Sequence, residues 1–152
     1  MIKRIALVAH DARKQELVSW VKFNAGSLKE CHLFCTGTTG RLVEEALSEV
    51  LGDDNMPPID KLLSGPLGGD AQIGALIAED KVDMLVFFCD NLIMQGHQND
   101  VMSLVRLASL YNIPFATNRS TADFIISSPL YNDESYERII PACIESYKNR
   151  KL

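Results

Sequence analysis

The segment Ser64-Gly65-Pro66-Leu67-Gly68-Gly69-Asp70 lies between an apolar run that ends at Leu63 and a helical pattern that starts near Ala71. Its small residues let backbone N–H groups approach a ligand closely, and the positive end of the following helix favours a negatively charged group. The segment therefore predicts an anion-binding turn between a strand and a helix.

Asp70 has two interpretations in this turn. A carboxylate repels a bound phosphate, so Asp70 is either an ordinary N-cap of the following helix or a base that removes a proton from a phosphorylated substrate. On this segment alone the cap is the simpler interpretation, and the rest of the chain has to decide between the two.

Length and charge restrict the class of protein. The chain has 152 residues, of which 47% are hydrophobic, and a formal charge of −5, which fits one domain over residues 1–152 with a single core. The negative charge and the lack of a Lys/Arg block argue against nucleic acid or an anionic membrane as a partner. The apolar run that stops at His10 is too short for a signal peptide, and no run approaches membrane-spanning length, so we expect a cytoplasmic protein.

The cysteines indicate a reducing compartment. Cys31, Cys35, Cys89 and Cys143 form neither a CxxC pair nor a Cys/His cluster with zinc spacing. We therefore expect buried free thiols, no disulfide and no structural metal.

Short apolar runs alternate with helical patterns along the chain. Strands are expected at 4–9, 31–35, 61–63, 84–88 and 114–117, and helices around 17–21, from 42 to about 51, and at 71–79, 100–111 and 121–127, with a last helix beginning near Pro141. Segments 36–40 and 52–58 are predicted to be turns or surface loops. The aromatic residues expected in the core are Trp20, Phe23, Phe87 and Phe88.

Five strand–turn–helix units predict a single α/β domain with a mainly parallel five-stranded sheet and helices on both faces. Ligands of such sheets bind at the carboxyl ends of the strands. Polar residues gather at these ends: His10 and Asp11 after the first strand, the threonine turn after the second, SGPLGGD after the third, and Asp90 and His97 after the fourth.

Two of these turns suit a phosphate group. Thr36, Thr38 and Thr39 surround Gly37 just before a helix, Ser64 and Gly65 supply a second wall, and Lys14 lies one helical turn after His10. The alternative is that one threonine caps the helix and the others are solvated turn residues.

The ionisable residues suit proton transfer. In the loop before the fourth helix, His97 precedes Asp100 by three residues, and a neutral imidazole there could polarise a substrate carbonyl. His32 lies within a strand pattern and is expected to be a packed or edge residue. No pair of possible ligands has a recognisable metal spacing, so we expect no metal.

With these loops assembled, the chain resembles methylglyoxal synthases along nearly its whole length. The matching segments are IALVAHD at 5–11 with Lys14, TGTTG at 36–40, SGPLGGDAQIGALIAE at 64–79, VFFCD at 86–90, His97 with Asp100, and NIPFATNRSTADFIISSP at 112–129. The two turns TGTTG and SGPLGGD, in that order at consecutive strand ends, are the specific part of the match.

The resemblance implies a flavodoxin-like three-layer fold and an enzyme that converts dihydroxyacetone phosphate into methylglyoxal and inorganic phosphate through an enediolate. By position, Asp70 matches the catalytic base, His97 and His10 match substrate contacts, and Asp90 and Asp100 match supporting aspartates. Lys14, Thr36, Gly37, Thr38, Thr39, Ser64 and Gly65 match positions around the substrate or its phosphate, and Arg150 matches an arginine that reaches a neighbouring subunit's site.

The family also implies a homohexamer, no metal or organic cofactor, and phosphate as a product and possible inhibitor. Related domains serve instead as non-catalytic sensors of phosphate ligands, which is the alternative function. Two features depart from the family: the segment around 53–58 is longer, and Asn91 and Asn99 stand where prolines are common, so we expect a more mobile loop around His97.

Overall fold

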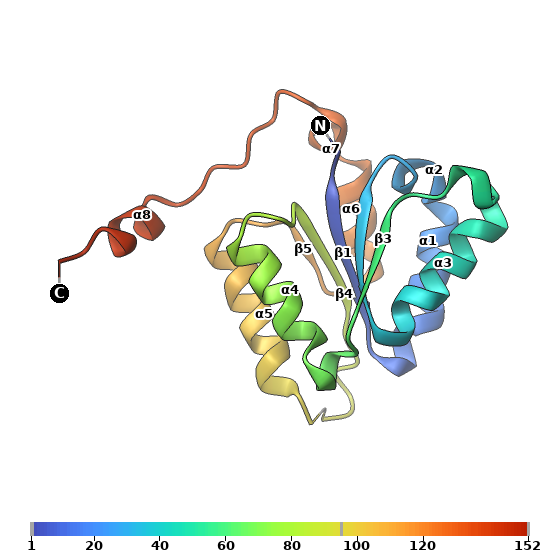
Figure 1. The fold of residues 1–152 in the computed structure, drawn as a ribbon, viewed down its shortest axis with the longest axis horizontal. Coiled ribbons are helices and arrows are strands. Elements are labelled where there is room, and N and C mark those ends of the chain that lie inside the picture. The colour runs from blue at the N-terminus through green and yellow to red at the C-terminus, as the bar shows by residue number, and fades with distance from the viewer. Residues whose placement is uncertain (1, 95, 152) are drawn as a thin grey trace.

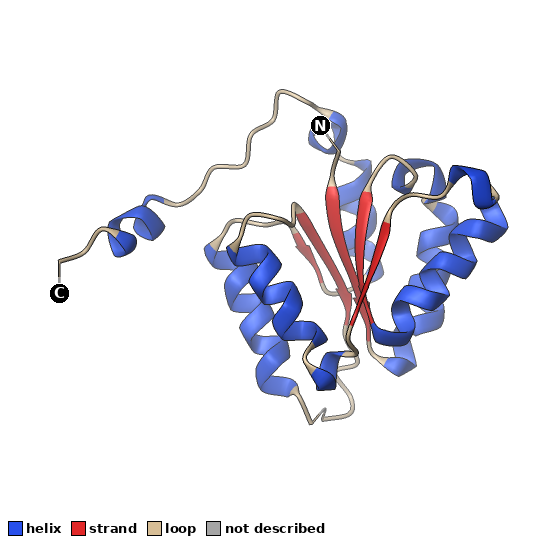
Figure 2. Ribbon diagram, viewed as in Figure 1, coloured by secondary structure: helices blue, strands red, loops and turns tan. Residues whose placement is uncertain are grey.

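The structure is a computed structural model and describes residues 2–94 and 96–151. Within these residues, five parallel strands form one sheet in the order β3-β2-β1-β4-β5, drawn in red in Figure 2. The strands are β1 (Arg4–Ala9), β2 (His32–Thr36), β3 (Ile59–Leu62), β4 (Met84–Phe88) and β5 (Phe115–Ala116).

Helices cover both faces of this sheet (Figure 1). One face carries α1 (Lys14–Phe23), α2 (Ala25–Leu28), α3 (Gly37–Leu51), α6 (Arg119–Ser127) and α7 (Pro129–Asn132). The other carries α4 (Gly69–Ala78) and α5 (Gln98–Leu110). Short 3-10 turns form at Asp11–Arg13, Asp53–Asn55 and Gly65–Leu67. The predicted three-layer α/β fold is therefore confirmed.

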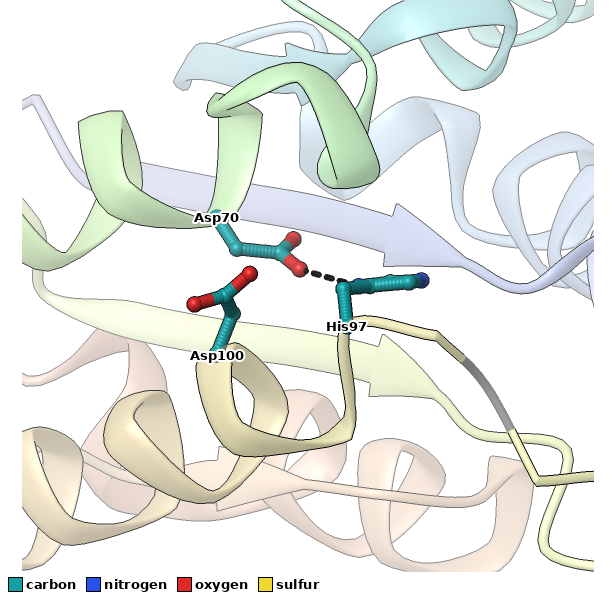
Figure 3. A group of neighbouring side chains, drawn as sticks. All are labelled: Asp70, His97 and Asp100. Atoms are coloured by element: carbon teal, nitrogen blue, oxygen red, sulfur yellow. Dashed lines mark hydrogen bonds and ion pairs between the residues drawn. The ribbon is translucent and has the colours of Figure 1, made fainter.

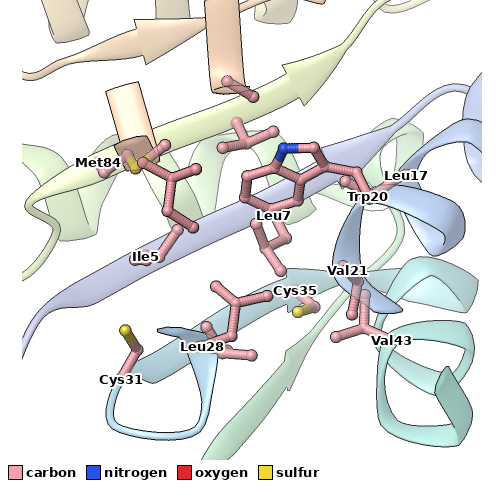
Figure 4. Close-up of a cluster of buried hydrophobic side chains, with 14 of the residues drawn as sticks. Ile5, Leu7, Leu17, Trp20, Val21, Leu28, Cys31, Cys35, Val43 and Met84 are labelled. Atoms are coloured by element: carbon pink, nitrogen blue, oxygen red, sulfur yellow. The ribbon is translucent and has the colours of Figure 1, made fainter. Parts of the chain in front are cut away.

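The central strand β1 contributes side chains to both hydrophobic cores. Along β1, Ile5 and Leu7 point into the core under α1 and α3, whereas Ala6 and Val8 point into the core under α4 and α5. This alternation follows from the two-residue period of a strand. Figure 4 shows the first core, in which the Trp20 ring is fully buried. Because both faces of the sheet are buried, the strand ends are held in fixed positions. The site described below is built on these strand ends.

Several element boundaries differ from the sequence predictions. β3 begins at Ile59 rather than 61, and α4 and α5 each begin two residues earlier than expected. Segment 37–40, predicted as part of a turn, is the first turn of α3. The short helices α2 and α7 were not predicted. Helix propensities are weak in such short segments, where tertiary packing decides.

Two side chains lie outside the core that was expected to hold them. Phe23 is 81% exposed at the end of α1, whereas Trp20, Phe87 and Phe88 are fully buried as predicted. Cys143 is exposed on α8 (Ala142–Lys148), while Cys31, Cys35 and Cys89 are buried, and all four are free thiols. Burial raises the pKa of the Cys35 thiol to about 12 and that of Cys89 to about 11, which makes both unreactive.

The C-terminal segment leaves the domain at the end of the sheet where the strands begin. The Arg138 guanidinium donates to the Tyr111 carbonyl at 2.7 Å and pairs with Asp80, and the Asn112 amide donates to the Ile139 carbonyl at 3.0 Å. Beyond these contacts, α8 and the C-terminus extend away from the domain (Figure 1). No helix in the described part of the chain has the length and hydrophobicity needed to cross a membrane.

The turn from β3 into α4 leaves no space for a side chain at Gly69. A Cβ atom there would lie 2.0 Å from the Leu63 carbonyl oxygen, and the Gly69 N–H donates to the Ser64 carbonyl at 3.0 Å. Gly68, just before it, has a φ of 112°, which favours glycine. The two glycines therefore set the position at which α4 begins.

We predict that Gly69→Ala destabilises the protein by about 1–3 kcal/mol or more, because the added methyl group overlaps backbone that cannot move aside cheaply. Urea unfolding would measure this as a lower midpoint. The matched control is Gly26→Ala, since a Cβ at Gly26 has nothing within 4 Å and α2 gains a better helix former. Equal midpoints for the two variants would contradict the prediction.

Candidate active site

A cavity of about 450 Å³ opens at the carboxyl ends of the strands. Most of the predicted site residues line it: His10, Lys14, Thr36, Gly37, Thr38, Thr39, Ser64, Gly65, Asp70, Asp90 and His97. Val8, Ala9, Asp11, Ala12, Pro66, Phe87 and Ile93 complete the lining. The structure thus brings together side chains that are up to 87 residues apart in the chain, from His10 to His97.

His10 and Asp90 meet where β1 and β4 lie side by side. The backbone N–H of His10 donates to the Phe88 carbonyl at 3.1 Å. The backbone N–H of Asp90 donates to the imidazole Nδ1 of His10 at 2.8 Å. Because Nδ1 accepts this hydrogen bond, a neutral His10 carries its proton on Nε2. His10 Nε2 is buried without a protein partner. His10 therefore presents an unused donor to the cavity.

The surroundings of His10 favour its neutral form. Burial lowers the pKa of the imidazole, and the nearby His97 and Lys14 lower it further, against the opposite effect of Asp70 and Asp90. The His10 ring also packs edge-on against Phe87, with 5.0 Å between ring centroids. At neutral pH the Nε2 donor is thus available without a positive charge.

Asp70 is the second residue of α4, and its side chain is 1% exposed. Its Oδ2 is 2.8 Å from His97 Nδ1, the hydrogen bond drawn dashed in Figure 3, and its Oδ1 is buried without a partner. Gly68 is the N-cap, and no side chain caps this helix. The interpretation of Asp70 as an N-cap is therefore wrong. The carboxylate instead faces the cavity.

The tautomer of His97 follows from this hydrogen bond. An ionised carboxylate can only accept, so the proton between Asp70 Oδ2 and His97 Nδ1 belongs to the histidine. A neutral His97 in this state has no proton on Nε2. The two histidines of the cavity, with ring centroids 5.5 Å apart, consequently differ: His10 offers a donor and His97 an acceptor.

Gly65 allows these groups to come close. A Cβ atom on Gly65 would lie 3.1 Å from both carboxylate oxygens of Asp70 and 3.2 Å from His97 Cε1. A side chain there would crowd both residues. The sequence assigned Gly65 to phosphate binding alone, and the structure adds close packing against Asp70 and His97.

The threonine and glycine turns form one continuous wall. The Gly37 N–H donates to the Leu63 carbonyl at 3.1 Å, and a Cβ on Gly37 would lie 2.8 Å from the Cα of Ser64. Thr36 precedes α3 but makes no side-chain cap, so the capping alternative is not observed. The first N–H groups of α3 lack intrahelical acceptors and point their positive end at the cavity, which suits an anion.

Lys14 supplies positive charge beside this wall. Its Nζ pairs with Asp11 and lies 3.3 Å from the Ala9 carbonyl oxygen. The Asp11 side chain is almost fully exposed, so this surface pair costs little to rearrange. An anion in the cavity can therefore recruit the Lys14 ammonium.

Two predicted site residues are not in the cavity lining. The Asp100 side chain lies on the first turn of α5 and points toward Asp70 (Figure 3). Arg150 lies on the C-terminal segment, where its guanidinium stacks on the Tyr147 ring at 3.5 Å. His32 stacks on Phe34 and bonds Asp60 at 3.0 Å, as expected of a packed residue. Sequence reasoning missed Pro66 and Ile93 as parts of the wall, since neither carries a polar group.

Comparison with known proteins shows the family to which the chain belongs. The family model of the MGS-like domain matches residues 16–117. A methylglyoxal synthase of Leptospira interrogans is 50% identical over 139 residues, which cover 91% of this chain and 88% of the relative. The chain belongs to the methylglyoxal synthase family. The resemblance found in the sequence is thereby confirmed.

Other methylglyoxal synthases match over still more of the chain. The protein of Maridesulfovibrio salexigens is 47% identical, with 99% of this chain and 98% of the relative covered. The crystal structure of methylglyoxal synthase from Elizabethkingia anophelis NUHP1 superimposes with a TM-score of 0.84 at 43% identity, covering 99% of this chain and 93% of that one. The whole described fold is thus that of a methylglyoxal synthase.

We predict that activity falls on the acid side as His10 becomes protonated, because the cation loses the Nδ1 acceptor for the Asp90 N–H. Since the pKa of His10 is lowered, this decline lies below the ordinary histidine value of about 6.5. The unfolded chain binds the proton more readily, so the associated stability is complete above that value and is lost as the pH falls. The pH dependence of kcat/KM and of the urea midpoint measures both effects.

The surface histidine provides the control for this titration. His32→Asn should leave the acid limb unchanged, whereas His10→Asn should remove the corresponding titration along with much of the activity. An acid limb that persists unaltered in His10→Asn would assign the titration to another group.

Proposed function

We propose that this site removes a proton from dihydroxyacetone phosphate and then expels inorganic phosphate, so that methylglyoxal is formed. The observation that carries the proposal is Asp70 Oδ1, a buried carboxylate oxygen without a partner, in the same cavity as two anion-binding turns. A binding protein gains nothing from a buried carboxylate next to a phosphate. A lyase needs one as its base.

Asp70 is the proposed base, and Oδ1 is the atom that takes the proton. Oδ2 is held by His97, which leaves Oδ1 for the C–H bond next to the substrate carbonyl. As the proton leaves carbon, negative charge moves onto the carbonyl oxygen and an enediolate forms. A positioned base of this kind typically contributes about 10²–10⁴-fold to the rate.

The two histidines have different proposed tasks. His10 Nε2–H donates to the carbonyl oxygen as it becomes negative, and the Asp90 N–H keeps the imidazole in this tautomer. His97 holds the base and offers Nε2 to the substrate hydroxyl. The sequence suggested His97 as the polarising group, whereas the hydrogen bonds support His10 for this task.

The phosphate is the leaving group of the second step. The enediolate pushes electrons toward the neighbouring carbon, the C–O bond to phosphate breaks, and phosphate leaves with that electron pair. The resulting enol becomes methylglyoxal when its terminal carbon gains a proton and its hydroxyl group loses one. The wall formed by Thr36, Gly37, Thr39 and Ser64, together with Lys14, stabilises the departing charge.

These residues supply every proposed step, so we propose no metal or organic cofactor. Asp90 and Asp100 act as supports, Asp90 through its N–H to His10 and Asp100 through its N–H to the His97 carbonyl at 2.9 Å. Released phosphate can return to the same wall, which makes it a competitive inhibitor. The cytosol, the source of triose phosphates, is the proposed location.

We propose that the protein is a homo-oligomer, and a hexamer by analogy with the family. In such an assembly Arg150 can act at the site of a neighbouring subunit. Arg138 and Ile139 are fastened to the end of the sheet opposite the cavity, and the chain then runs away from the domain. Arg150 therefore lies far from the cavity of its own chain in this conformation. We propose that it reaches the phosphate bound in a neighbouring subunit, where a guanidinium matches phosphate oxygens well.

We predict that Asp70→Asn lowers kcat by about 10²–10⁴-fold because the amide cannot accept the proton. Binding of phosphate should be equal or tighter, because a negative charge next to the anion is removed. Turnover is measured with dihydroxyacetone phosphate in the absence of added metal, by assaying methylglyoxal, inorganic phosphate and glyceraldehyde 3-phosphate together.

The expected products are methylglyoxal and phosphate in equal amounts. The exposed Asp54→Asn, on the surface loop after α3, is the matched control and should keep full activity. Unchanged turnover in Asp70→Asn would remove Asp70 as the base. A wild-type protein that binds phosphate without turnover would be a sensor of phosphate ligands instead.

The role of Arg150 can be tested by mixing inactive subunits. We predict that chains carrying Asp70→Asn and chains carrying Arg150→Gln, each of low activity alone, recover part of the activity when assembled together. Some mixed sites then combine an intact Asp70 with an intact Arg150 from the neighbour. Light scattering measures the assembly, and absence of any recovery in mixed oligomers would place Arg150 outside the neighbour's site.

A further inference from the structure

Asp70, His97 and Asp100 form a cluster that the proposed reaction does not fully use. One ligand atom from each side chain lies within 4.8 Å of the other two. Asp70 and Asp100 lie in the first turns of α4 and α5, which lie side by side, and His97 directly precedes α5. The Asp100 carboxylate points toward Asp70, whose own carboxylate is turned toward His97 (Figure 3). No short metal motif in the sequence indicates this cluster, because it joins two separate segments.

The cluster has the donor atoms of a transition-metal site, and these atoms lie within 4.8 Å of one another. One imidazole nitrogen and carboxylate oxygens suit Zn²⁺, whose bonds of about 2.0–2.2 Å place neighbouring ligand atoms roughly 3–3.5 Å apart. His97 Nδ1 and Asp70 Oδ2 are 2.8 Å apart already. A small opening of this pair admits an ion in place of the hydrogen-bonded proton.

A second observation points to a ligand at this cluster. Asp70 Oδ1 has no partner although the side chain is 1% exposed, so a buried oxygen is left with unused lone pairs. Among residues 2–94 and 96–151, neither Asp70 nor Asp100 forms an ion pair with a lysine or arginine. Two neighbouring carboxylates without such a cation favour the binding of a positive ion.

We propose that Asp70, His97 and Asp100 bind a divalent zinc ion that inhibits the enzyme. The ion binds the carboxylate with which Asp70 takes the substrate proton, and Asp70 and His97 both line the cavity. It is an inhibitor of the reaction proposed above and not a cofactor. Binding can be measured without turnover, so the two proposals fail separately.

The test is calorimetric titration with zinc chloride in a buffer free of phosphate, after treatment with a chelator. All variants carry Cys143→Ser, because the exposed thiol would bind zinc by itself. We expect one tight ion per chain, and about 10–100-fold weaker binding in Asp100→Asn. Asp100 is exposed, so this variant should fold, which circular dichroism verifies.

The matched control is His32→Asn. It removes a second His–Asp pair, His32 with Asp60, which lies outside the proposed zinc site. Zinc binding should be unchanged in it. Turnover of the parent protein should fall with zinc and return with EDTA, and Asp100→Asn should need about 10-fold more zinc for the same fractional loss. No zinc binding by the parent, equal binding by Asp100→Asn, or loss of binding in His32→Asn would each overturn the proposal.

Discussion

The site depends on a carboxylate that is buried away from water without a lysine or arginine to pair with it in the described chain. Desolvating such a group costs on the order of several kcal/mol, which the rest of the fold must offset. The first turn of α4 and the His97 Nδ1–H stabilise Asp70 in part. Its Oδ1, which has no partner, is the atom that we propose as the base.

Close packing at three glycines fixes the turn that carries Asp70, in addition to the hydrogen bond from His97. Gly37 touches Ser64, Gly65 touches Asp70 and His97, and Gly69 touches the Leu63 carbonyl. At each of these three positions a side chain larger than that of glycine would crowd or overlap its neighbours. The turns that follow β2 and β3 and the loop that carries His97 can therefore pack closely against one another. The two buried cores beneath them fix the strands themselves, which makes the proposed base and the proposed anion-binding wall one rigid unit.

The sequence was sufficient for the fold because its strongest patterns concern burial. The run at 84–88 is apolar on both sides, and it is indeed the fully buried strand β4. Phe23 was predicted to be buried but is exposed at the end of α1. The hydrophobicity of a residue does not by itself show whether its side chain faces the core or the solvent at the end of a helix. The cap interpretation of Asp70 failed for a similar reason. Capping depends on a helix boundary being correct to one residue, and α4 begins two residues before the predicted start.

Pairwise geometry, in contrast, could not be obtained from the sequence, and it decides the chemistry. The tautomer of His10 depends on the Asp90 N–H, which is 80 positions away, and that of His97 on a carboxylate 27 positions away. One histidine is thereby set to donate and the other to accept. A substrate that matches both must carry a carbonyl oxygen and a hydroxyl group on neighbouring carbons, with the phosphate at the distance of the threonine wall. An analogue without the hydroxyl group leaves His97 Nε2 unpaired in the cavity, so we propose that the hydrogen bonds that position the proposed base also discriminate against such an analogue.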